Sequence, residues 1–388
     1  MATASEPAAT DHRLVEIDAL RGLIMVLMAL DHTRDFIMGL EPSPTDLATT
    51  TPALFATRWV THICAPGFIL LAGVSAFLLG QKRSAASLSS FLALRGAFLV
   101  VLEVTVVTFA WLPDPSRSLI LLQVIWAIGW SMILLAGLIH LPRPAMAAVA
   151  LGLLGMVAWA DIQGFGIPAV PPSVAVFLLL GGETVPTGDQ SALLVSYAVL
   201  PWAAVMALGY LLGPVFTRGE GARGRLLVRL GLGMIAAFLL LRATGVGDPV
   251  PWVAQDTATR TVMALLNAEK YPPSPVYLLM TLGPTLLLLA AFARIRTFAI
   301  ARVLVPLGRA PLFFYVLHLY ALRALGLALA AIVWGPGQLG PPPLHSTPEW
   351  GLGATWAIWI AALAVLFWPT RWFARLKARS RGAWTSYL

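Results

Sequence analysis

Apolar stretches recur along the whole chain, separated by short segments that contain Pro, Gly or charged residues. Because a helix needs about 20 apolar residues to cross the hydrocarbon core of a bilayer, each stretch predicts a transmembrane helix. The predicted helices cover residues 17–39, 54–80, 90–111, 118–140, 144–162, 192–215, 226–244, 274–293, 311–334 and 351–370. A further stretch, 168–182, is rich in Pro and too short to span comfortably, which predicts a re-entrant or interfacial segment. The predicted fold class is all-α, a polytopic membrane bundle of about ten transmembrane helices.

The composition supports a lipid environment. Hydrophobic residues make up 59% of the 388 residues and charged residues only 11%, with a mean hydropathy of +0.82. A soluble domain carries about 25% charged residues, so most of this chain is expected to have the lipid bilayer as its solvent. The acids Glu6, Asp11 and Glu16 precede the first apolar stretch and argue against a signal peptide.

The positive charges indicate an orientation. The net charge is +8, and Lys and Arg gather in alternate connecting segments and in the C-terminal tail. Positive residues accumulate on the cytoplasmic side of membrane proteins, so both termini are predicted to be cytoplasmic, and nucleic acid is not needed to explain the charge. The predicted organisation is a cytoplasmic segment 1–16, a transmembrane domain 17–373 and a basic cytoplasmic tail 374–388. The Ala-, Gly- and Arg-rich composition is typical of a GC-rich bacterium, whose cytoplasmic (inner) membrane would be the location.

Ionisable residues inside the predicted helices are the informative ones, because each costs about 2.5 kcal/mol or more at the bilayer centre unless protein or water surrounds it. In the first helix, Asp18 and Arg21 lie three residues apart near its start and can form an intrahelical pair. A denser cluster follows at the other end of this helix: Asp31, His32, Arg34 and Asp35. Four such groups exceed what a membrane anchor requires, so this cluster is a candidate site.

Two further predicted helices carry related groups. Arg58 and His62 lie four residues apart near the start of the second helix, and an antiparallel arrangement would place them opposite the first cluster. In the ninth helix, FFYVLHLYALRAL contains His318 and Arg323 among aromatic residues. Glu103 and Gln123 are isolated polar insertions, each a candidate partner for an Arg or a His. The single cysteine, Cys64, is expected to pack as a small hydrophobe.

This set of residues is compatible with several functions. A His beside a carboxylate suits a general base or a transient acyl acceptor, and neighbouring Arg residues suit an anionic or carbonyl-bearing substrate. The same groups could relay protons in a proton-coupled small-molecule transporter, and a scaffolding protein is a third alternative. Two His and an Asp could bind zinc, but no HExxH-type spacing is present, so no metal site is predicted.

Motifs spread over nearly the whole chain carry a family resemblance. They include the opening RLVEIDALRGLIMVLMALDHTRDF, the segment DLATTTPALFATRWVTHICAPGFILLAGVSAFLLG, LGRAPLFFYVLHLYALRAL and the terminal RWFARLKARSRGAWTSYL. These segments resemble the bacterial membrane proteins grouped with heparan-α-glucosaminide N-acetyltransferase. The RL-x-x-ID-x-x-RG opening and the F-x-x-x-x-G-x-S pattern of the second helix resemble the eukaryotic enzyme as well.

The resemblance implies a transmembrane acyltransferase. Such enzymes take an acetyl group from acetyl-CoA on the cytosolic side and deliver it to an amine or hydroxyl, commonly of a sugar, on the other side. Acyl-CoA would be a co-substrate, with no bound cofactor, and the sequence leaves open whether the chain forms a homodimer. A histidine after the first helix is central in the family, but residues 36–61 contain none here, so the role passes to His32 or His62.

The resemblance and the residue pattern together give one hypothesis for the site. His32, oriented by Asp31 or Asp35, is the base or acyl acceptor, and His62 is a second proton-transfer group. The remaining predicted roles are substrate binding by Arg34, Arg58, His318 and Arg323, and CoA-phosphate binding by Arg302 and Arg309.

Overall fold

The computed structural model describes residues 14–38, 42–112, 116, 118–162, 177, 181–188, 191–294, 298–335 and 350–380. Most of the predicted re-entrant segment 168–182 lies outside these residues, as do most of segment 1–16 and the last eight residues of the predicted tail.

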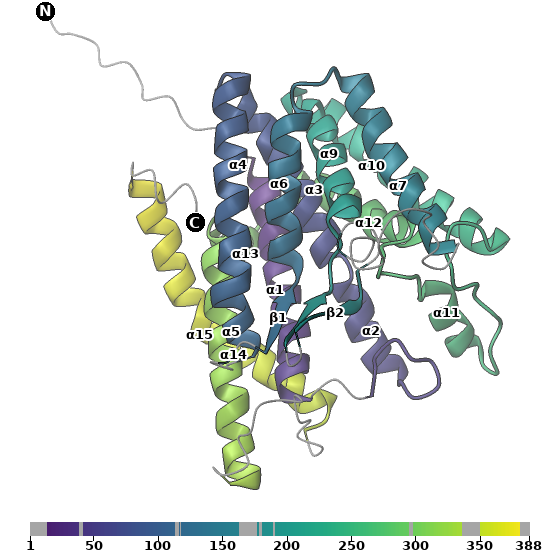
Figure 1. Ribbon diagram of the computed structural model, residues 1–388, viewed down its shortest axis with the longest axis vertical. Helices are drawn as coiled ribbons and strands as arrows, with labels where there is room; N and C mark the ends of the chain where they lie inside the picture. Colours follow the sequence, from purple (N-terminus) through teal and green to yellow (C-terminus); the bar gives the residue numbers. More distant parts are fainter. Residues whose placement is uncertain are drawn as a thin grey trace, which may run out of the picture.

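The described chain is mostly helical, as predicted (Figure 1). The α-helices are α1 (Val15–Ile37), α2 (Pro52–Thr61), α3 (Cys64–Gly80), α4 (Ala85–Leu102), α5 (Thr108–Trp111), α6 (Val124–Leu138), α7 (Arg143–Ile162), α9 (Val199–Leu212), α10 (Glu220–Thr244), α11 (Ala258–Leu266), α12 (Pro275–Arg294), α13 (Ala299–Arg309), α14 (Pro311–Trp334) and α15 (Leu352–Arg379). A π-helical turn (Glu103–Val107) joins α4 to α5, and a 3-10 turn (Gly213–Thr217) follows α9.

Seven helices among the described residues are long and apolar enough to cross a membrane. They are Pro52–Gly80, Ala85–Trp111, Val199–Thr217, Glu220–Thr244, Pro275–Arg294, Pro311–Val333 and Leu352–Arg379. The other three predicted spans contain α1, α6 and α7. Helix α1 carries many charged residues, and the apolar part of α6 has only 15 residues. The count of ten crossings and the orientation of the termini stay predictions.

A small sheet replaces the beginning of two predicted helices. Strands β1 (Leu119–Leu122) and β3 (Ser191–Val195) pair in parallel, and β2 (Glu183–Gly188) pairs antiparallel with β3, in the order β1-β3-β2. The predictions that helices begin at 118 and 192 are therefore wrong. Short Leu-rich runs do not distinguish a strand from a helix by periodicity, and pairing between distant segments decided the outcome here.

The predicted helix 54–80 is divided at His62 and Ile63, where α2 ends and α3 begins. Pro66 explains the division, because a proline has no N–H to donate to the carbonyl four residues earlier and its ring clashes with that carbonyl. The residue four positions earlier is His62, and its carbonyl instead accepts a hydrogen bond of 3.0 Å from the Tyr277 hydroxyl of α12.

Helix α1 lies at the centre of the bundle and contacts α3, α12, α13, α14 and α15. Its approach to α13 is close enough to require glycine on both helices. A Cβ atom on Gly22 would lie 2.0 Å from the Leu304 carbonyl oxygen, and one on Gly308 would lie 1.8 Å from the Asp18 carbonyl oxygen. Small residues permit such crossings in membrane proteins. This packing carries Asp18 and Arg21 next to α13.

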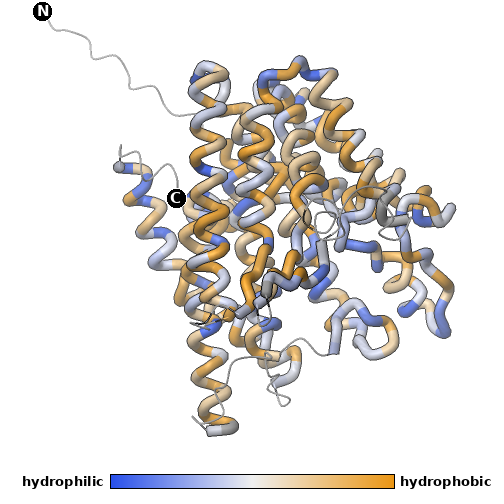
Figure 2. The backbone as a smooth tube through the Cα atoms, viewed as in Figure 1, coloured by the Kyte–Doolittle hydropathy of each residue, from blue (hydrophilic) through white to orange (hydrophobic). Residues whose placement is uncertain are grey.

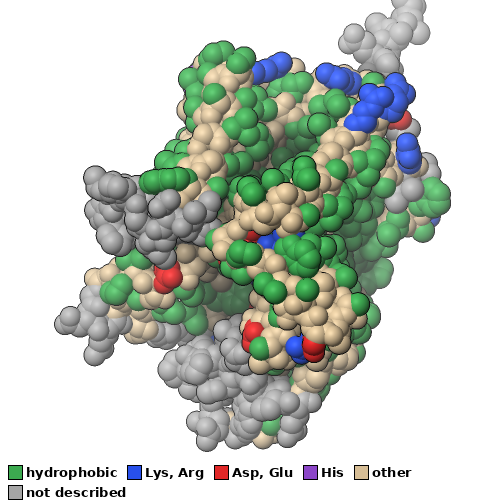
Figure 3. Space-filling model, turned by 90° about the vertical axis from the view of Figure 1, so that its right-hand side faces the viewer, with side chains coloured by type: hydrophobic (Ala, Val, Ile, Leu, Met, Phe, Trp, Pro, Cys, Tyr) green, Lys and Arg blue, Asp and Glu red, His purple; other side chains and the backbone are tan. Residues whose placement is uncertain are grey.

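The distribution of polarity agrees with a multi-pass membrane protein. Hydrophobic residues dominate the long helices, whereas hydrophilic residues concentrate toward turns and loops (Figure 2). In the side view, Lys and Arg gather near the top of the molecule (Figure 3). Arg223 of α10 is buried and pairs with Glu16 of α1 at 2.6 Å.

Candidate functional site

One cavity of about 430 Å³ runs beside α1. Its volume is within the range of small-molecule sites. We call its positively charged part the basic end, lined by Arg21, Arg83, Arg309 and Lys377. We call its opposite part the histidine end, lined by Asp31, His32, Thr61, Tyr197, Lys270 and Tyr315. Apolar residues such as Met25, Met28 and Phe68 line the space between them. Arg21 and His32 are eleven residues apart on α1, so the two ends are separated by about 16 Å at 1.5 Å per residue.

A chain of hydrogen bonds at the histidine end assigns the tautomer of His32. Nδ1 of His318 lies 2.9 Å from the Phe314 carbonyl oxygen, which can only accept, so this nitrogen carries the proton. Nε2 of His318 is then an acceptor, and it lies 2.8 Å from Nδ1 of His32, which must donate. The remaining nitrogen of His32, Nε2, therefore has a free lone pair. A neutral imidazole held in this tautomer can act as a general base.

The partner that orients His32 is thus His318 rather than Asp31 or Asp35. His318 is fully buried on α14, and its ring lies beside that of His32 and nearly parallel to it, with an interplanar angle of 9° and centroids 5.0 Å apart. The side chain is not among those that line the cavity. His318 therefore lies behind His32 as seen from the cavity, and its predicted role in substrate binding stays a prediction.

Four charged residues from the first two predicted helices form a network: Asp31, Arg34, Asp35 and Arg58. Arg58 of α2 contacts Asp31 of α1, which confirms the predicted apposition of these two helices. Arg34 lies 3.4 Å from Asp31 and also contacts Asp35. Neither Arg34 nor Arg58 lines the cavity, since both guanidinium groups turn to these carboxylates. Asp31 is the member of the network that reaches the cavity.

His62 lies apart from this arrangement. It is 4% exposed, its ring meets Tyr277 edge to face at a centroid distance of 5.5 Å, and its Nδ1 has no hydrogen-bond partner among the described residues. The cavity is lined by its neighbours Thr61 and Cys64 but not by His62 itself. The break in the helix at this position turns the imidazole toward α12.

Tyr315 is a residue to which the sequence assigned no role. It lies one helical turn before His318 on α14 and lines the cavity, with its ring 6.2 Å from that of His32. The residue is 3% exposed, and its hydroxyl has no hydrogen-bond partner among the described residues. A buried hydroxyl is costly to leave unpaired, so a donor is available here for a ligand. Its spacing from His318, three residues along one helix, was the available signal.

Lys270 is the second residue that sequence reasoning missed. It precedes α12, lines the histidine end, and places its ammonium 5.3 Å from the Tyr197 ring centroid and 4.7 Å from that of Tyr271. Burial lowers the pKa of Lys270; Tyr271 opposes this shift and the Arg58 guanidinium adds to it. Burial alone would raise the pKa of Tyr271, but Lys270 and Arg58 lower it overall. Lys270 lies in a connecting segment, where a lysine is ordinarily solvated, so its sequence position gave no signal of a site.

Asp18 organises the basic end. Its carboxylate lies 3.3 Å from Arg309 of α13 and 4.0 Å from Arg21, which confirms the predicted intrahelical pair. Arg21 also donates to Ser75 of α3. Arg302, predicted beside Arg309 as a phosphate ligand, is exposed and does not line the cavity.

Three other predicted polar residues lie away from the cavity lining. Arg323 sits with its guanidinium carbon 5.9 Å from the Phe36 ring centroid. Among the residues that the structure describes, Glu103 pairs with no Arg or His; its carboxylate accepts from the backbone N–H groups of Gln123 at 3.2 Å and Trp126 at 3.0 Å. It therefore caps the N-terminus of α6, where a carboxylate satisfies unpaired N–H groups. Gln123 precedes α6 instead of lying within a helix, which corrects the prediction.

A comparison with known protein families shows to which family the chain belongs. The model for "Heparan-alpha-glucosaminide N-acetyltransferase, catalytic" matches residues 13–241, which is more than half of the sequence. The chain belongs to this family. Membership implies transmembrane acetyltransferase activity in general terms. No curated protein matches the chain.

The match covers only part of the cavity lining. It includes the α1 residues Arg21, Asp31 and His32, which come from both ends of the cavity. Lys270 and Tyr315 belong to the part of the chain beyond residue 241, as do Arg309 and Lys377 at the basic end. The family match therefore leaves the roles of these four residues to be argued from their geometry.

Proposed function

We propose that the protein transfers an acetyl group from acetyl-CoA, bound at the basic end, to an amine or hydroxyl of a sugar acceptor, bound at the histidine end. The observation that carries this proposal is a single cavity whose lining joins six cationic side chains to an oriented imidazole; the cations are Arg21, Arg83, Arg95, Lys270, Arg309 and Lys377. By the distribution of positive charge, the basic end faces the cytoplasm and the acceptor arrives from the other side. The host would be a bacterial cytoplasmic membrane.

The two ends suit the two parts of an acyl-CoA. Its phosphates would be bound near Arg309 and Arg83, because ammonium and guanidinium groups form charge-assisted hydrogen bonds with phosphate. The pantetheine arm is a long, narrow chain that would lie along Met25 and Met28. The thioester would then reach the level of His32 and Tyr315, away from bulk water.

The chemistry follows from the hydrogen-bonding roles at the histidine end. The acceptor nitrogen or oxygen attacks the thioester carbonyl carbon and gives its proton to Nε2 of His32. The Tyr315 hydroxyl donates to the carbonyl oxygen as negative charge develops on it. The C–S bond then breaks, and the imidazolium returns the proton to the CoA thiolate. His318 holds the tautomer that makes Nε2 the base.

The test is turnover of radiolabelled acetyl-CoA by the purified protein in detergent, with an amino sugar as acceptor. The expected result is acetylated sugar and free CoA in equal amounts, with turnover at least about 10³-fold slower in His32→Ala, because the general base is lost. His140→Ala is the matched control, since His140 is exposed at the end of α6. If no acetyl group is transferred and a proton gradient drives sugar uptake instead, the protein is a transporter and the proposal fails.

A further inference from the structure

The cations at the histidine end differ in how their charges are neutralised. Arg58 contacts the Asp31 carboxylate, and Arg34 contacts Asp35 and lies 3.4 Å from Asp31. Lys270 takes part in no ion pair among the residues that the structure describes, although it lies close enough to Asp31 and His32 to act on them electrostatically. The histidine end therefore contains one cation more than its two carboxylates neutralise.

Two aromatic rings hold the Lys270 ammonium in place. Tyr197 approaches from the segment that follows β3, where its backbone N–H donates to the Leu122 carbonyl at 3.2 Å. Tyr271 approaches from the next residue along the chain, and its side chain also forms a hydrogen bond with that of Lys270. Aromatic faces stabilise a cation by electrostatic attraction, so the N–H donors of the ammonium that do not bind Tyr271 are available for an acceptor atom. The ammonium is thus positioned without a carboxylate partner among the described residues.

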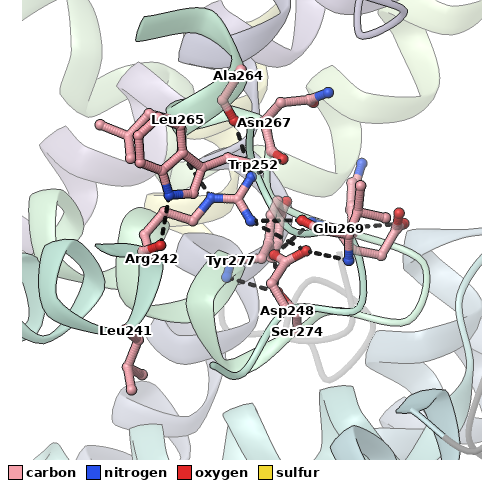
Figure 4. A network of polar contacts seen from close by, with 12 residues as sticks. Leu241, Arg242, Asp248, Trp252, Ala264, Leu265, Asn267, Glu269, Ser274 and Tyr277 are labelled. Atoms are coloured by element: carbon pink, nitrogen blue, oxygen red, sulfur yellow. Dashed lines mark hydrogen bonds and ion pairs between the residues drawn. The ribbon is translucent and has the colours of Figure 1, made fainter. Parts of the chain in front are cut away.

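A buried network fixes the backbone that carries Lys270. Arg242, at the end of α10, is 2% exposed and lies 3.4 Å from Asp248 (Figure 4). Its guanidinium also donates to the carbonyls of Val250, Ala264, Leu265 and Asn267. These bonds tie the segment between α10 and α12 to the end of α10.

The network then continues to the residue before Lys270. Asp248 accepts from the Glu269 backbone N–H at 3.1 Å and from the Ser274 hydroxyl at 3.0 Å (Figure 4). The Glu269 carboxylate in turn accepts from the backbone N–H groups of Lys270 at 3.0 Å and Tyr271 at 2.8 Å. So many bonds to one segment indicate a preorganised position rather than a solvated loop charge.

We propose that Lys270 binds an anionic substituent, a carboxylate or a phosphate, on the acceptor. This inference rests on the proposed function, because it assigns the acceptor to the histidine end. An anion would neutralise the ammonium, which has no ion-pair partner among the described residues, and would accept from the N–H donors that do not bind Tyr271. It would also orient the acceptor so that its amine or hydroxyl faces Nε2 of His32. A neutral acceptor would leave the ammonium unpaired in a partly buried site, which is unfavourable.

The test compares acceptors that share one amine and differ in charge: glucosamine, glucosamine 6-phosphate and muramic acid, which bears a carboxylate. The wild-type protein is expected to use one or both anionic sugars with a KM about 10- to 100-fold lower than that of glucosamine, the range of a charged hydrogen bond. Lys270→Gln should abolish this preference by raising the KM of the anionic sugars to that of glucosamine. Lys270→Arg should retain part of it. The preferred substituent, phosphate or carboxylate, identifies the chemical class of the acceptor.

Arg260→Gln is the matched control. Arg260 is a cation of the same segment, on α11, but its side chain is 38% exposed and does not line the cavity. It should leave all three KM values unchanged. Equal use of neutral and anionic sugars by the wild type, or an unchanged preference in Lys270→Gln, would overturn the inference while leaving acyl transfer intact.

A binding measurement separates this inference from the proposed function. Calorimetric titration of glucosamine 6-phosphate and muramic acid into the wild type and Lys270→Gln requires no turnover. Binding that is lost in the variant, in a protein that transfers no acetyl group, would support the anion site and refute the acyltransferase. An active acyltransferase that shows neither binding of the anionic sugars nor a preference for them would refute the anion site alone.

Discussion

The two ends of the cavity bind charge in different ways. At the basic end, Arg309 is 40% exposed and shares the Asp18 carboxylate with Arg21, so its guanidinium can reach solvent and a mobile ligand. At the histidine end, Arg58 and Asp31 are at most 17% exposed and form an ion pair with each other. An exposed cation adds little energy and adapts to its ligand, whereas a buried network is rigid and costly to disturb.

This difference predicts which kinetic constant, KM or kcat, changes in each variant. Changes at the basic end should raise the KM for acyl-CoA, because they weaken binding of a part of the donor that does not react. Changes to His32 or Tyr315 at the histidine end should lower kcat, because they remove interactions made with the reacting atoms.

After loss of His32 itself, the largest of these effects is expected for Tyr315→Phe. This change removes only the unpaired hydroxyl, and kcat should fall by about 10²- to 10³-fold, as for loss of one oxyanion donor. KM for acetyl-CoA should change little. Tyr320→Phe is the control, because that hydroxyl donates to the Val106 carbonyl at 2.9 Å and does not line the cavity. Steady-state kinetics of both variants decide whether Tyr315 contacts the transition state; equal kcat values would exclude it.

The second effect concerns His318. In His318→Phe, Nδ1 of His32 loses its acceptor, so the imidazole is no longer held in the tautomer with a free Nε2. We expect kcat to fall by about 10²-fold, less than the roughly 10⁴-fold seen when a triad loses its tautomer-holding partner. His318→Gln keeps an acceptor oxygen and should recover part of the loss. Two variants with the same kcat would contradict the positioning role, and melting temperatures of both would detect a general loss of folding.

The third effect belongs to the basic end. Arg309→Gln should raise the KM for acetyl-CoA by about three- to tenfold with kcat unchanged, because one exposed charge-assisted contact to phosphate is lost. Arg302→Gln provides the comparison on the same helix, since Arg302 is exposed outside the cavity lining. A larger effect of Arg302→Gln would restore the sequence-based assignment of this residue and place the phosphates elsewhere.

The smallest effect concerns the chemical reactivity of Cys64, which lies between the two ends of the cavity. Cys64 is the only cysteine, and it lines the cavity with its sulfur 3.7 Å from the Ile24 carbonyl oxygen. Saturating acetyl-CoA should slow its modification by methyl methanethiosulfonate a few-fold, measured by mass spectrometry of the intact protein. Dephospho-CoA should protect less at equal concentration if the basic end recognises phosphate. Protection by the acceptor alone would instead place the donor away from this part of the cavity.

Much of the site was predictable because ionisable residues cost free energy in an apolar helix. Asp31, His32 and Arg58 could be recognised from charge alone, and their apposition followed from a short connection between two antiparallel helices. His318 was also recognisable as a polar residue among aromatic ones. Its contact with His32 was not, because the two residues are 286 positions apart and no pattern in either helix specifies the other.

Lys270 and Tyr315 could not be recognised in the same way. Lys270 lies in a connecting segment, where a lysine is ordinarily solvated, and Tyr315 is a common residue in a membrane helix. Their significance comes from burial and from missing partners, which only a folded chain defines. The same limit explains the strands β1 and β3, because each is stabilised by hydrogen bonds to a segment far away in the sequence.

The amino-acid sequence by itself determined that this chain is a multi-pass helical membrane protein with its ionisable groups concentrated on α1 and α2, since hydropathy and the cost of burying charge act locally along each helix. The tertiary structure alone decided which nitrogen of His32 is free, which cations line the cavity and which lysine lacks a counter-ion. These properties depend on contacts between α1, α12, α13 and α14. Such contacts are set by the packing of side chains at close helix crossings, which no single helix encodes.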